Sequence, residues 1–171
     1  VTTLKLLELS NPNNVLLKKL LMDAPGTYHH SMLVANLAEM ASEEVGANSV
    51  VTRIGAYYHD IGKTQKPYFF AENQIGGDNP HNNLDPELSA KIIISHVKDG
   101  IELAKKYNIP SVIQDIIAQH HGTTLVKYFY YTAKNNAENP DDIKEENFRY
   151  PGPIPNSKES GIIMLADSVE A

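Results

Sequence analysis

The sequence contains no cysteine. It can therefore form neither a disulfide framework nor a thiolate zinc site, so any metal ion must be bound through nitrogen and oxygen atoms. It also lacks an apolar run of about eighteen residues, which a membrane-spanning helix needs, and no basic and apolar signal segment opens it. Basic residues form no cluster and the net charge is −6, which argues against broad binding to a nucleic-acid polymer. We expect a soluble protein that attracts anionic ligands only locally.

The length of 171 residues suits a single domain, residues 1–171, that buries a core without disulfides. The chain opens abruptly at Val1 and stops at Ala171 within an apparent helix. We therefore expect it to be a domain of a longer protein.

Apolar residues recur at helical spacing along most of the chain, and the alternation that is typical of strands is almost absent. This pattern predicts an all-α fold. Gly46 has the position of a residue that ends a helix, and Asp85-Pro86-Glu87 has the composition of a helix start. The predicted helical segments are 4–9, 15–22, 27–46, 48–59, one that begins at 85 and carries His96, 100–108, 111–121, 123–135 and one that begins near 156.

Two stretches do not follow the helical pattern. Residues 67–85 are too long and too broken for a simple connection, and their aromatic residues favour an ordered flap, either as a small satellite core or as a surface that stacks on bases. Residues 136–156 are polar, acidic and rich in proline, which predicts an exposed excursion. Asn156 and Glu159 then have the spacing of a capping box for the last helix.

The pair His59-Asp60 ends an apolar run, and Lys63 follows three residues later. A neutral imidazole offers one nitrogen to one divalent ion, whereas a carboxylate has two oxygens and can bridge two ions. Adjacent residues on a helix point roughly 100° apart, so the pair suits two neighbouring ions better than one. A lone His-Asp pair is common and seldom catalytic, so the interpretation depends on the rest of the chain.

Further polar residues lie on the predicted inward faces of other helices. His96, His120 and Asp167 each follow apolar residues by three and four positions, and His30 extends the apolar stripe of its helix backwards, while His29 lies toward the edge of that stripe. One buried histidine is usually a hydrogen-bonded core residue. Several buried histidines on separate helices, together with two aspartates, would each add a free-energy cost of burial. A pair of metal ions removes that cost.

The order of these residues resembles the HD superfamily of metal-dependent phosphohydrolases, and the additional histidines resemble its two-metal branch. The resemblance covers nearly the whole chain. More narrowly, the insert Phe70-Ala71-Glu72-Asn73-Gln74 and the closing segment Ala166 to Ala171 are similar to the cytoplasmic HD domain of seven-transmembrane-receptor HD proteins. The matching positions are His30-Ser31, His59-Asp60-x-x-Lys63, His96, His120-His121 and Asp167.

The resemblance implies an HD-domain helical bundle with a long ordered insert loop. It implies a cytoplasmic domain of a bacterial cell-membrane protein, attached through membrane segments that are absent from this chain. The oligomeric state stays open. It also implies two divalent ions, iron or manganese, one bound by His30, His59, Asp60 and Asp167 and the other by Asp60, His96, His120 and His121.

Such a metal pair activates a bridging hydroxide for attack on a phosphodiester. Asp60 would then be the ligand shared by the two ions, and Lys63 would place a point charge near the phosphate. The alternative for Lys63 is an ordinary surface lysine.

The resemblance implies that the substrate is a small cyclic dinucleotide. Relatives that cleave cyclic di-GMP carry His-His-Glu and Gly-Tyr-Pro, whereas this chain has His120-His121-Gly122 and no Gly-Tyr-Pro. This departure favours a phosphodiesterase that hydrolyses cyclic di-AMP to linear pApA. The alternatives are a cyclic di-GMP phosphodiesterase, another HD nucleotide phosphohydrolase such as an alarmone hydrolase, and a non-catalytic nucleotide-sensing module that regulates a membrane partner.

Overall fold

The structure, a computed structural model, describes residues 1–171 and confirms the all-α expectation. It contains no strand, only one isolated bridge between Leu125 and Arg149. Short 3-10 turns are η1 (Ile61–Gln65), η2 (Pro67–Phe69), η3 (Ala71–Asn73), η4 (Pro80–Asn83), η5 (Pro140–Asp142) and η6 (Glu145–Phe148). The helices are α1 (Thr3–Glu8), α2 (Val15–Asp23), α3 (Pro25–Val45), α4 (Ser49–Tyr58), α5 (Pro86–Lys106), α6 (Ser111–Gln119), α7 (Lys127–Asn136) and α8 (Lys158–Glu170).

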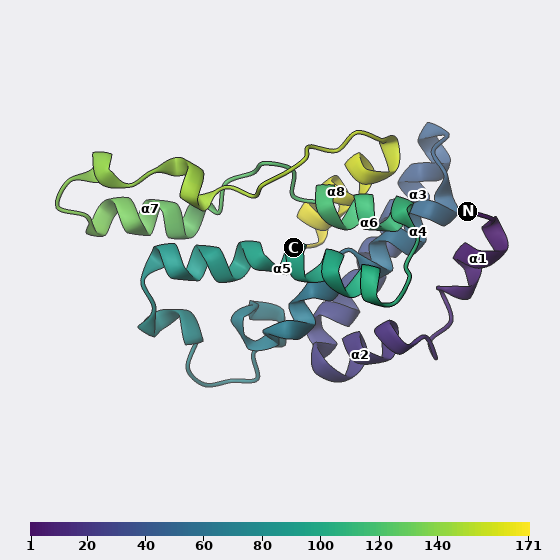
Figure 1. The fold of residues 1–171 in the computed structure, drawn as a ribbon, viewed down its shortest axis with the longest axis horizontal. Coiled ribbons are helices and arrows are strands. Elements are labelled where there is room, and N and C mark those ends of the chain that lie inside the picture. Colours follow the sequence, from purple (N-terminus) through teal and green to yellow (C-terminus); the bar gives the residue numbers. More distant parts are fainter.

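The core lies where α3, α4, α6 and α8 pack together (Figure 1). The buried face of α3 carries the small residues Ser31, Ala35, Ala38 and Ser42, spaced three or four apart, which let neighbouring helices approach closely. In Figure 1, α7 and the segment that follows it lie over one end of α5, away from α1. None of the helices combines the length and the apolar character needed to cross a lipid bilayer.

Helix α5 is longer than the pattern predicted. It runs without a break through Gly100, where we expected a new helix to begin. A Cβ at Gly100 would lie 3.0 Å from the Ile117 side chain and 3.3 Å from the Gly62 amide nitrogen. The glycine therefore marks a close contact between α5 and η1, and not a helix boundary.

Helix α7 begins at Lys127, four residues later than predicted. Gly122 has a φ of 54°, so the chain turns sharply after His121. The residues that follow then pair with a distant segment, because the Val126 amide donates to the Phe148 carbonyl and the Tyr150 amide donates to the Thr124 carbonyl. Backbone pairing across this distance has no local sequence signal.

The expectation of an exposed excursion over 136–156 was wrong in part. Most of residues 137–147 are exposed, but Phe148 is fully buried and Tyr150 is 8% exposed. Phe148 packs with Ala90, Tyr130 and Ala133 in a second apolar cluster between α5 and α7. We call residues 148–150 the strap. It crosses back over the bundle next to the end of α6.

The cap of α8 also differs from the prediction. Ser157, and not Asn156, is the N-cap, and its hydroxyl accepts from the Ser160 amide. Glu159 does not fold back onto its own helix, because its carboxylate accepts a hydrogen bond from the Asn48 amide at the start of α4. The predicted end of α3 is confirmed, since Gly46 is left-handed with a φ of 69°.

Residues 67–84 include the segment Phe70 to Gln74, and from here on we call all of them the insert. The insert is ordered as expected and docks on the start of α3. The N-cap of α3, Ala24, has no capping side chain. Instead Asn73 accepts a hydrogen bond from the Thr27 amide at 3.0 Å and donates to the Thr27 hydroxyl at 2.8 Å. Gly26 allows this approach, because a Cβ there would lie 1.8 Å from the Glu72 carbonyl oxygen.

Candidate metal centre

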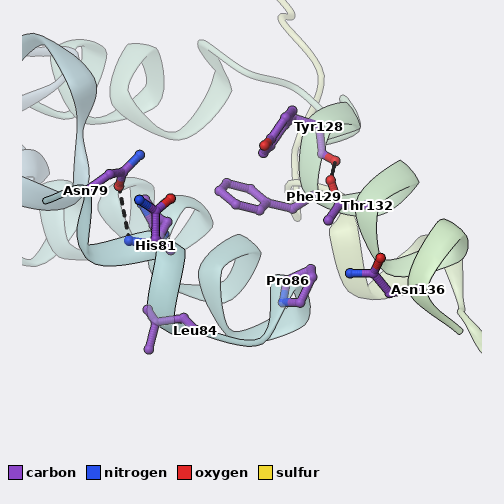
Figure 2. Close-up of a pocket in the computed structure, with 9 residues that line it drawn as sticks. Asn79, His81, Leu84, Pro86, Tyr128, Phe129, Thr132 and Asn136 are labelled. Atoms are coloured by element: carbon purple, nitrogen blue, oxygen red, sulfur yellow. Dashed lines mark hydrogen bonds between the residues drawn. The ribbon is translucent and has the colours of Figure 1, made fainter.

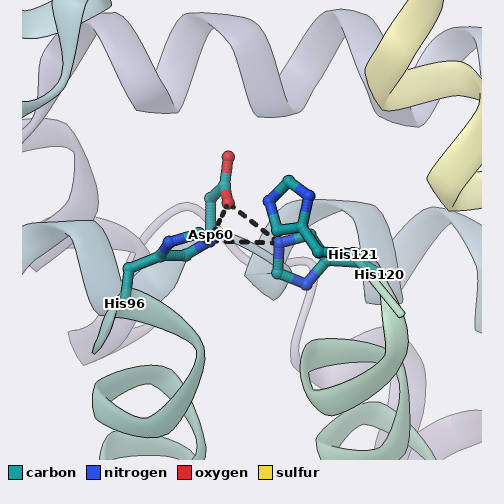
Figure 3. A group of neighbouring side chains, drawn as sticks. All are labelled: Asp60, His96, His120 and His121. Atoms are coloured by element: carbon teal, nitrogen blue, oxygen red, sulfur yellow. Dashed lines mark hydrogen bonds and ion pairs between the residues drawn. The ribbon is translucent and has the colours of Figure 1, made fainter. Parts of the chain in front are cut away.

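Seven polar side chains from the inner face of the bundle meet at one place, and they are the seven that the sequence singled out as ligands. They form two groups that share Asp60, and within each group the atoms that could bind a metal all lie within 4.8 Å of one another. Figure 3 shows the first group converging from α5 and from the end of α6 onto the Asp60 carboxylate. The groups are Asp60, His96, His120 and His121, and His30, His59, Asp60 and Asp167.

The sequence argument assumed that His59 and Asp60 lie on one helix, but in the structure they do not. His59 directly follows α4 and keeps a helical conformation, with φ −56° and ψ −35°, whereas Asp60 directly precedes η1 and has φ −106° and ψ 17°. The change of helix type, and not a regular step along one helix, therefore sets the directions of the two side chains. Both are almost fully buried.

Three of the histidines are oriented by their own backbone. The Nδ1 atoms of His59, His96 and His120 lie 2.6, 2.6 and 2.7 Å from the carbonyl oxygens three residues earlier in the chain. A carbonyl only accepts, so Nδ1 carries the proton in each ring. In the neutral form every Nε2 therefore presents a lone pair. This is the arrangement that metal-binding histidines usually have.

These lone pairs point at one another and at Asp60. The Nε2 atoms of His96 and His120 are 3.2 Å apart, and each lies 3.3 Å from Asp60 Oδ1. His59 Nε2 lies 3.2 Å from Asp60 Oδ2. Acceptors facing acceptors repel one another unless a cation lies between them.

The same atoms are left without conventional partners. Nε2 of His59 and both carboxylate oxygens of Asp60 are buried and make no hydrogen bond, and the one cation of the chain beside Asp60 is the Lys63 ammonium, an ion pair at 3.1 Å from Oδ2. An unsatisfied buried carboxylate is costly. The donor set of imidazole nitrogen and carboxylate oxygen suits iron, manganese and similar divalent ions. The residues therefore fit a metal centre.

The second group is closed by Asp167 from α8. Its Oδ1 atom lies 2.6 Å from His30 Nε2 and 3.4 Å from His59 Nε2. Although burial alone would raise it, the hydrogen bond with His30 and the nearby His59 ring hold the pKa of Asp167 well below its ordinary range. The carboxylate is therefore ionised and available to a cation.

His59 and Asp60 shift the pKa of one another. Burial opposes the charge on His59, yet Asp60 and Asp167 raise its pKa well above the ordinary value. Burial likewise opposes ionisation of Asp60, but His59 and Lys63 lower its pKa well below the ordinary value. Without a metal ion, a proton on His59 thus supplies positive charge that the cluster of acceptors requires.

Two further histidines, His120 and His121, favour the neutral form. Burial lowers the pKa of His120, and burial together with His120 and His96 lowers the pKa of His121 to about 2. Both rings therefore offer lone pairs throughout the physiological pH range.

Lys63 is not an ordinary surface lysine. Its side chain is 13% exposed, and its ammonium lies 3.1 Å from Asp60 Oδ2 and 2.8 Å from Glu72 Oε1. It also lies over the Phe70 ring, 4.9 Å from the centroid. Burial would lower its pKa, but Asp60 and Glu72 raise it, so the ammonium stays charged. A fixed positive charge therefore borders the two groups.

Two cavities open next to the centre. One of about 570 Å³ is lined by Lys63, Glu72, His121, Asp167 and Glu170, among others. The other, of about 540 Å³, reaches His120 and His121, and its lining includes Lys127 and Arg149. His121 lines both cavities, so a ligand larger than one phosphate has room on either flank of this side chain.

The remaining histidines lie outside the two groups. His29 is exposed, as the sequence indicated. His81 borders a separate pocket of about 260 Å³ between η4 and α7, with Tyr128 and Phe129 on its far wall (Figure 2). Nε2 of His81 donates to the Phe69 carbonyl at 2.7 Å, and Nδ1 accepts from the Ser89 hydroxyl at 2.9 Å. His81 is therefore fully bonded and fastens the insert to α5.

Sequence reasoning missed two residues next to the centre. Glu72 was seen only as part of the insert, and no sequence signal links it to Lys63. Tyr150 lies in the stretch that we expected to be exposed, yet its ring stacks on that of His121, with centroids 4.2 Å apart and an angle of 14° between the planes. The alternation of Phe148 and Tyr150 in an otherwise polar stretch is the signal from which a buried face could have been predicted.

Comparison with known proteins agrees with the resemblance seen in the sequence. The model of the HD domain family matches residues 27–171. The chain is 58% identical, over all of its 171 residues, to the cyclic-di-AMP phosphodiesterases PgpH of Bacillus subtilis (strain 168) and of Listeria monocytogenes serotype 1/2a (strain 10403S). It covers 24% and 23% of those proteins, so it spans about a quarter of the length of the curated relatives it matches.

A solved structure is also similar. The crystal structure of the L. monocytogenes phosphodiesterase PgpH HD domain in complex with cyclic-di-AMP superposes with a TM-score of 0.89 at 57% identity. The match covers 94% of this chain and 73% of that chain.

Proposed function

This chain belongs to the HD domain family, and on that premise we propose that it is a metal-dependent phosphodiesterase that hydrolyses cyclic di-AMP to linear pApA. The observation that carries the proposal is the division of Asp60 between the two groups, with Oδ1 facing His96 and His120 and Oδ2 facing His59. The named activity of the relatives supports the choice of substrate.

The proposed cofactors are two divalent ions, iron or manganese. His30, His59, Asp60 and Asp167 would hold one, and Asp60, His96, His120 and His121 would hold the other. The chemistry that such ions supply when bound is activation of a water molecule and neutralisation of negative charge on the phosphoryl oxygens. Nitrogen and oxygen donors of this kind suit these metals better than tetrahedral zinc.

The side chains of the protein have separate tasks in this proposal. The backbone carbonyls that accept from Nδ1 of His59, His96 and His120 hold each ring with Nε2 toward the centre. Lys63 is the proposed phosphate contact, because its ammonium is charged and lines the larger cavity. Glu72 keeps the ammonium at the edge of that cavity by accepting from it at 2.8 Å.

The proposed setting is the bacterial cytoplasm, with residues 1–171 acting as one HD domain of a membrane-anchored protein. The motif resemblance to the seven-transmembrane-receptor HD proteins supports the anchoring. Packing supports a single unit, because one apolar cluster includes residues of α1, α2, α3, α4, α6 and α8. Fractionation of cells that express the full-length protein tests the setting, and recovery of that protein in the soluble fraction would contradict it.

The activity is tested by reconstituting the purified chain with manganese or, under anaerobic conditions, with iron. Cyclic di-AMP, cyclic di-GMP and mononucleotides are then supplied separately and the products are resolved by chromatography. We expect pApA from cyclic di-AMP, with slower turnover of cyclic di-GMP and none of mononucleotides. Equal rates on the two cyclic dinucleotides would contradict the substrate assignment. Binding of cyclic di-AMP without any product would instead favour a sensing module.

A further inference from the structure

His121 differs from the other histidines of its group in how it is held. Nδ1 of His96 and of His120 donates to a carbonyl three residues earlier, which fixes each ring. The ring of His121 makes no hydrogen bond within the chain, because His121 lies beyond the end of α6, where the backbone turns at Gly122. The backbone carbonyl of His121 belongs to this turn, because it accepts hydrogen bonds from the amide and the hydroxyl of Thr124. Something else must set the direction of this imidazole.

The ring of Tyr150 is the neighbour that can do so. It stacks on His121 with centroids 4.2 Å apart and 14° between the planes. It also meets the His96 ring edge-on at 5.9 Å. A parallel stack restricts rotation of a ring out of its plane, which an ordinary apolar contact does not do as strictly.

Tyr150 is itself held rigidly. Its amide donates to the Thr124 carbonyl at 3.0 Å, and two residues earlier Phe148 accepts from Val126 at 2.8 Å. Between them, Arg149 Nη1 donates to the Thr123 carbonyl at 2.9 Å. The strap is therefore hydrogen-bonded to the segment that directly follows His121.

A packing role alone does not explain Tyr150. It is buried, yet it belongs to neither of the two apolar clusters. The aromatic rings that it contacts are those of His96 and His121. A tyrosine that served only to fill the core would be surrounded by apolar side chains.

We propose that Tyr150 is the positioning residue of His121, and that its ring does for this ligand what backbone carbonyls do for the others. The inference rests on the proposed function, because it assumes that His121 binds a metal ion. Removing the aromatic ring should weaken the ion held by Asp60, His96, His120 and His121, and should leave the other ion in place. Partners that orient a metal ligand typically change metal affinity by about 10- to 100-fold.

The test measures metal binding and not turnover. Wild type, Tyr150→Phe, Tyr150→Leu and the control Tyr128→Leu are titrated with Mn²⁺ against a competing chelator, and bound metal is counted after dialysis. Tyr128 suits the control because it is 74% exposed and lies outside both metal groups. We expect two equivalents with unchanged affinities for wild type, Tyr150→Phe and Tyr128→Leu. For Tyr150→Leu we expect an unchanged first equivalent and a second that binds at least about tenfold more weakly.

Each other outcome has a distinct meaning. Wild type that binds fewer than two equivalents would refute the proposed function. Two equivalents of wild-type affinity in Tyr150→Leu would refute the inference alone, and so would loss of the second ion in Tyr150→Phe, because that variant keeps the ring.

If Tyr150→Leu does not fold, proton NMR of metal-free wild type decides the question. The Tyr150 ring current should shift the His121 ring protons upfield of those of exposed His29, and the absence of such a shift would overturn the inference.

Discussion

Gly62 lies so close to His96 that a Cβ at position 62 would be 1.8 Å from the His96 carbonyl oxygen and 2.6 Å from the Gly100 amide nitrogen. No side chain fits there without moving η1 away from α5. Asp60 directly precedes η1, and His96 lies on α5 at the other side of the same contact. The glycine thus sets how closely the carboxylate of one element approaches the imidazole of the other.

Gly62→Ala should therefore destabilise the metal-free protein by about 1 to 3 kcal/mol, the usual cost of forcing extra atoms into a packed contact. Denaturant unfolding without metal measures this effect apart from metal binding. Gly161→Ala is the matched control, because a Cβ at this helical position meets no atom within 4 Å. Alanine there should leave stability unchanged or raise it. Equal midpoints for wild type and Gly62→Ala would show that η1 can shift at no cost.

Asp60→Ala should abolish binding of both metal ions, because its two oxygens face different groups, whereas His96→Ala should abolish mainly one. Elemental analysis after reconstitution and dialysis gives the number of equivalents. His29→Ala, an exposed histidine outside both groups, should keep two. A wild-type protein that retains one equivalent or fewer after full reconstitution would exclude a shared carboxylate.

The metal-free protein should be most stable near pH 6.5. The pKa of His59 is raised by Asp60 and Asp167 against the effect of burial. The stability that this provides is present below the unfolded-state pKa of about 6.5 and is lost as pH rises through the folded-state pKa. The pKa of His121 is lowered to about 2 by burial and by His120 and His96. The contribution of His121 to the stability of the fold is therefore present above about pH 6.5 and is lost on acidification. Stability should thus fall on both sides of this pH.

Bound metal should abolish the fall in stability above about pH 6.5. A bound ion requires neutral His59, so the metal-loaded protein has no stabilising proton to lose above about pH 6.5. Its metal affinity should fall on acidification, because the ion competes with a proton for His59. Melting temperatures measured from about pH 5 to about pH 8.5, with and without Mn²⁺, test both limbs. Two profiles of the same shape, merely offset in temperature, would contradict this account.

Lys63→Ala should keep both metal ions and lower turnover of cyclic di-AMP by roughly ten- to a thousandfold, the usual effect of losing one charge-assisted contact in the transition state. Steady-state kinetics and metal content are measured on the same samples. Lys66→Ala provides the control, since this lysine is nearby, half exposed and outside the metal groups. Loss of metal in Lys63→Ala would show that the lysine acts by holding Asp60, to which it is 3.1 Å away.

Asn73→Ala should destabilise the protein by about 1 to 3 kcal/mol, because it leaves the Thr27 amide at the start of α3 without its buried partner. It should also free the insert, which hydrogen exchange of residues 67–84 would detect. Asn139→Ala removes a comparable cap at exposed η5 and should have little effect. Unchanged exchange of the insert in Asn73→Ala would mean that other contacts hold it.

The sequence by itself determined the helical class and the inward positions of the polar residues. Helical periodicity fixes which face of a helix is buried, so His96, His120 and Asp167 were placed inward from the apolar residues three and four positions before them. The same rule does not reveal where a helix stops if tertiary contacts decide it. Helix α5 therefore continues through Gly100, and α7 starts later than its composition indicated.

Only the tertiary structure decided which residues support the centre. The Tyr150 ring stacks on His121, and Glu72 accepts a hydrogen bond from Lys63. Asn73 caps α3, which lies far from it in the sequence. Each of these residues lies in an irregular stretch whose path has no period, so no local pattern indicates its partners. The two oxygens of Asp60 were likewise divided between two groups by the turn from α4 into η1 and by the close contact at Gly62, because these set the direction of the carboxylate.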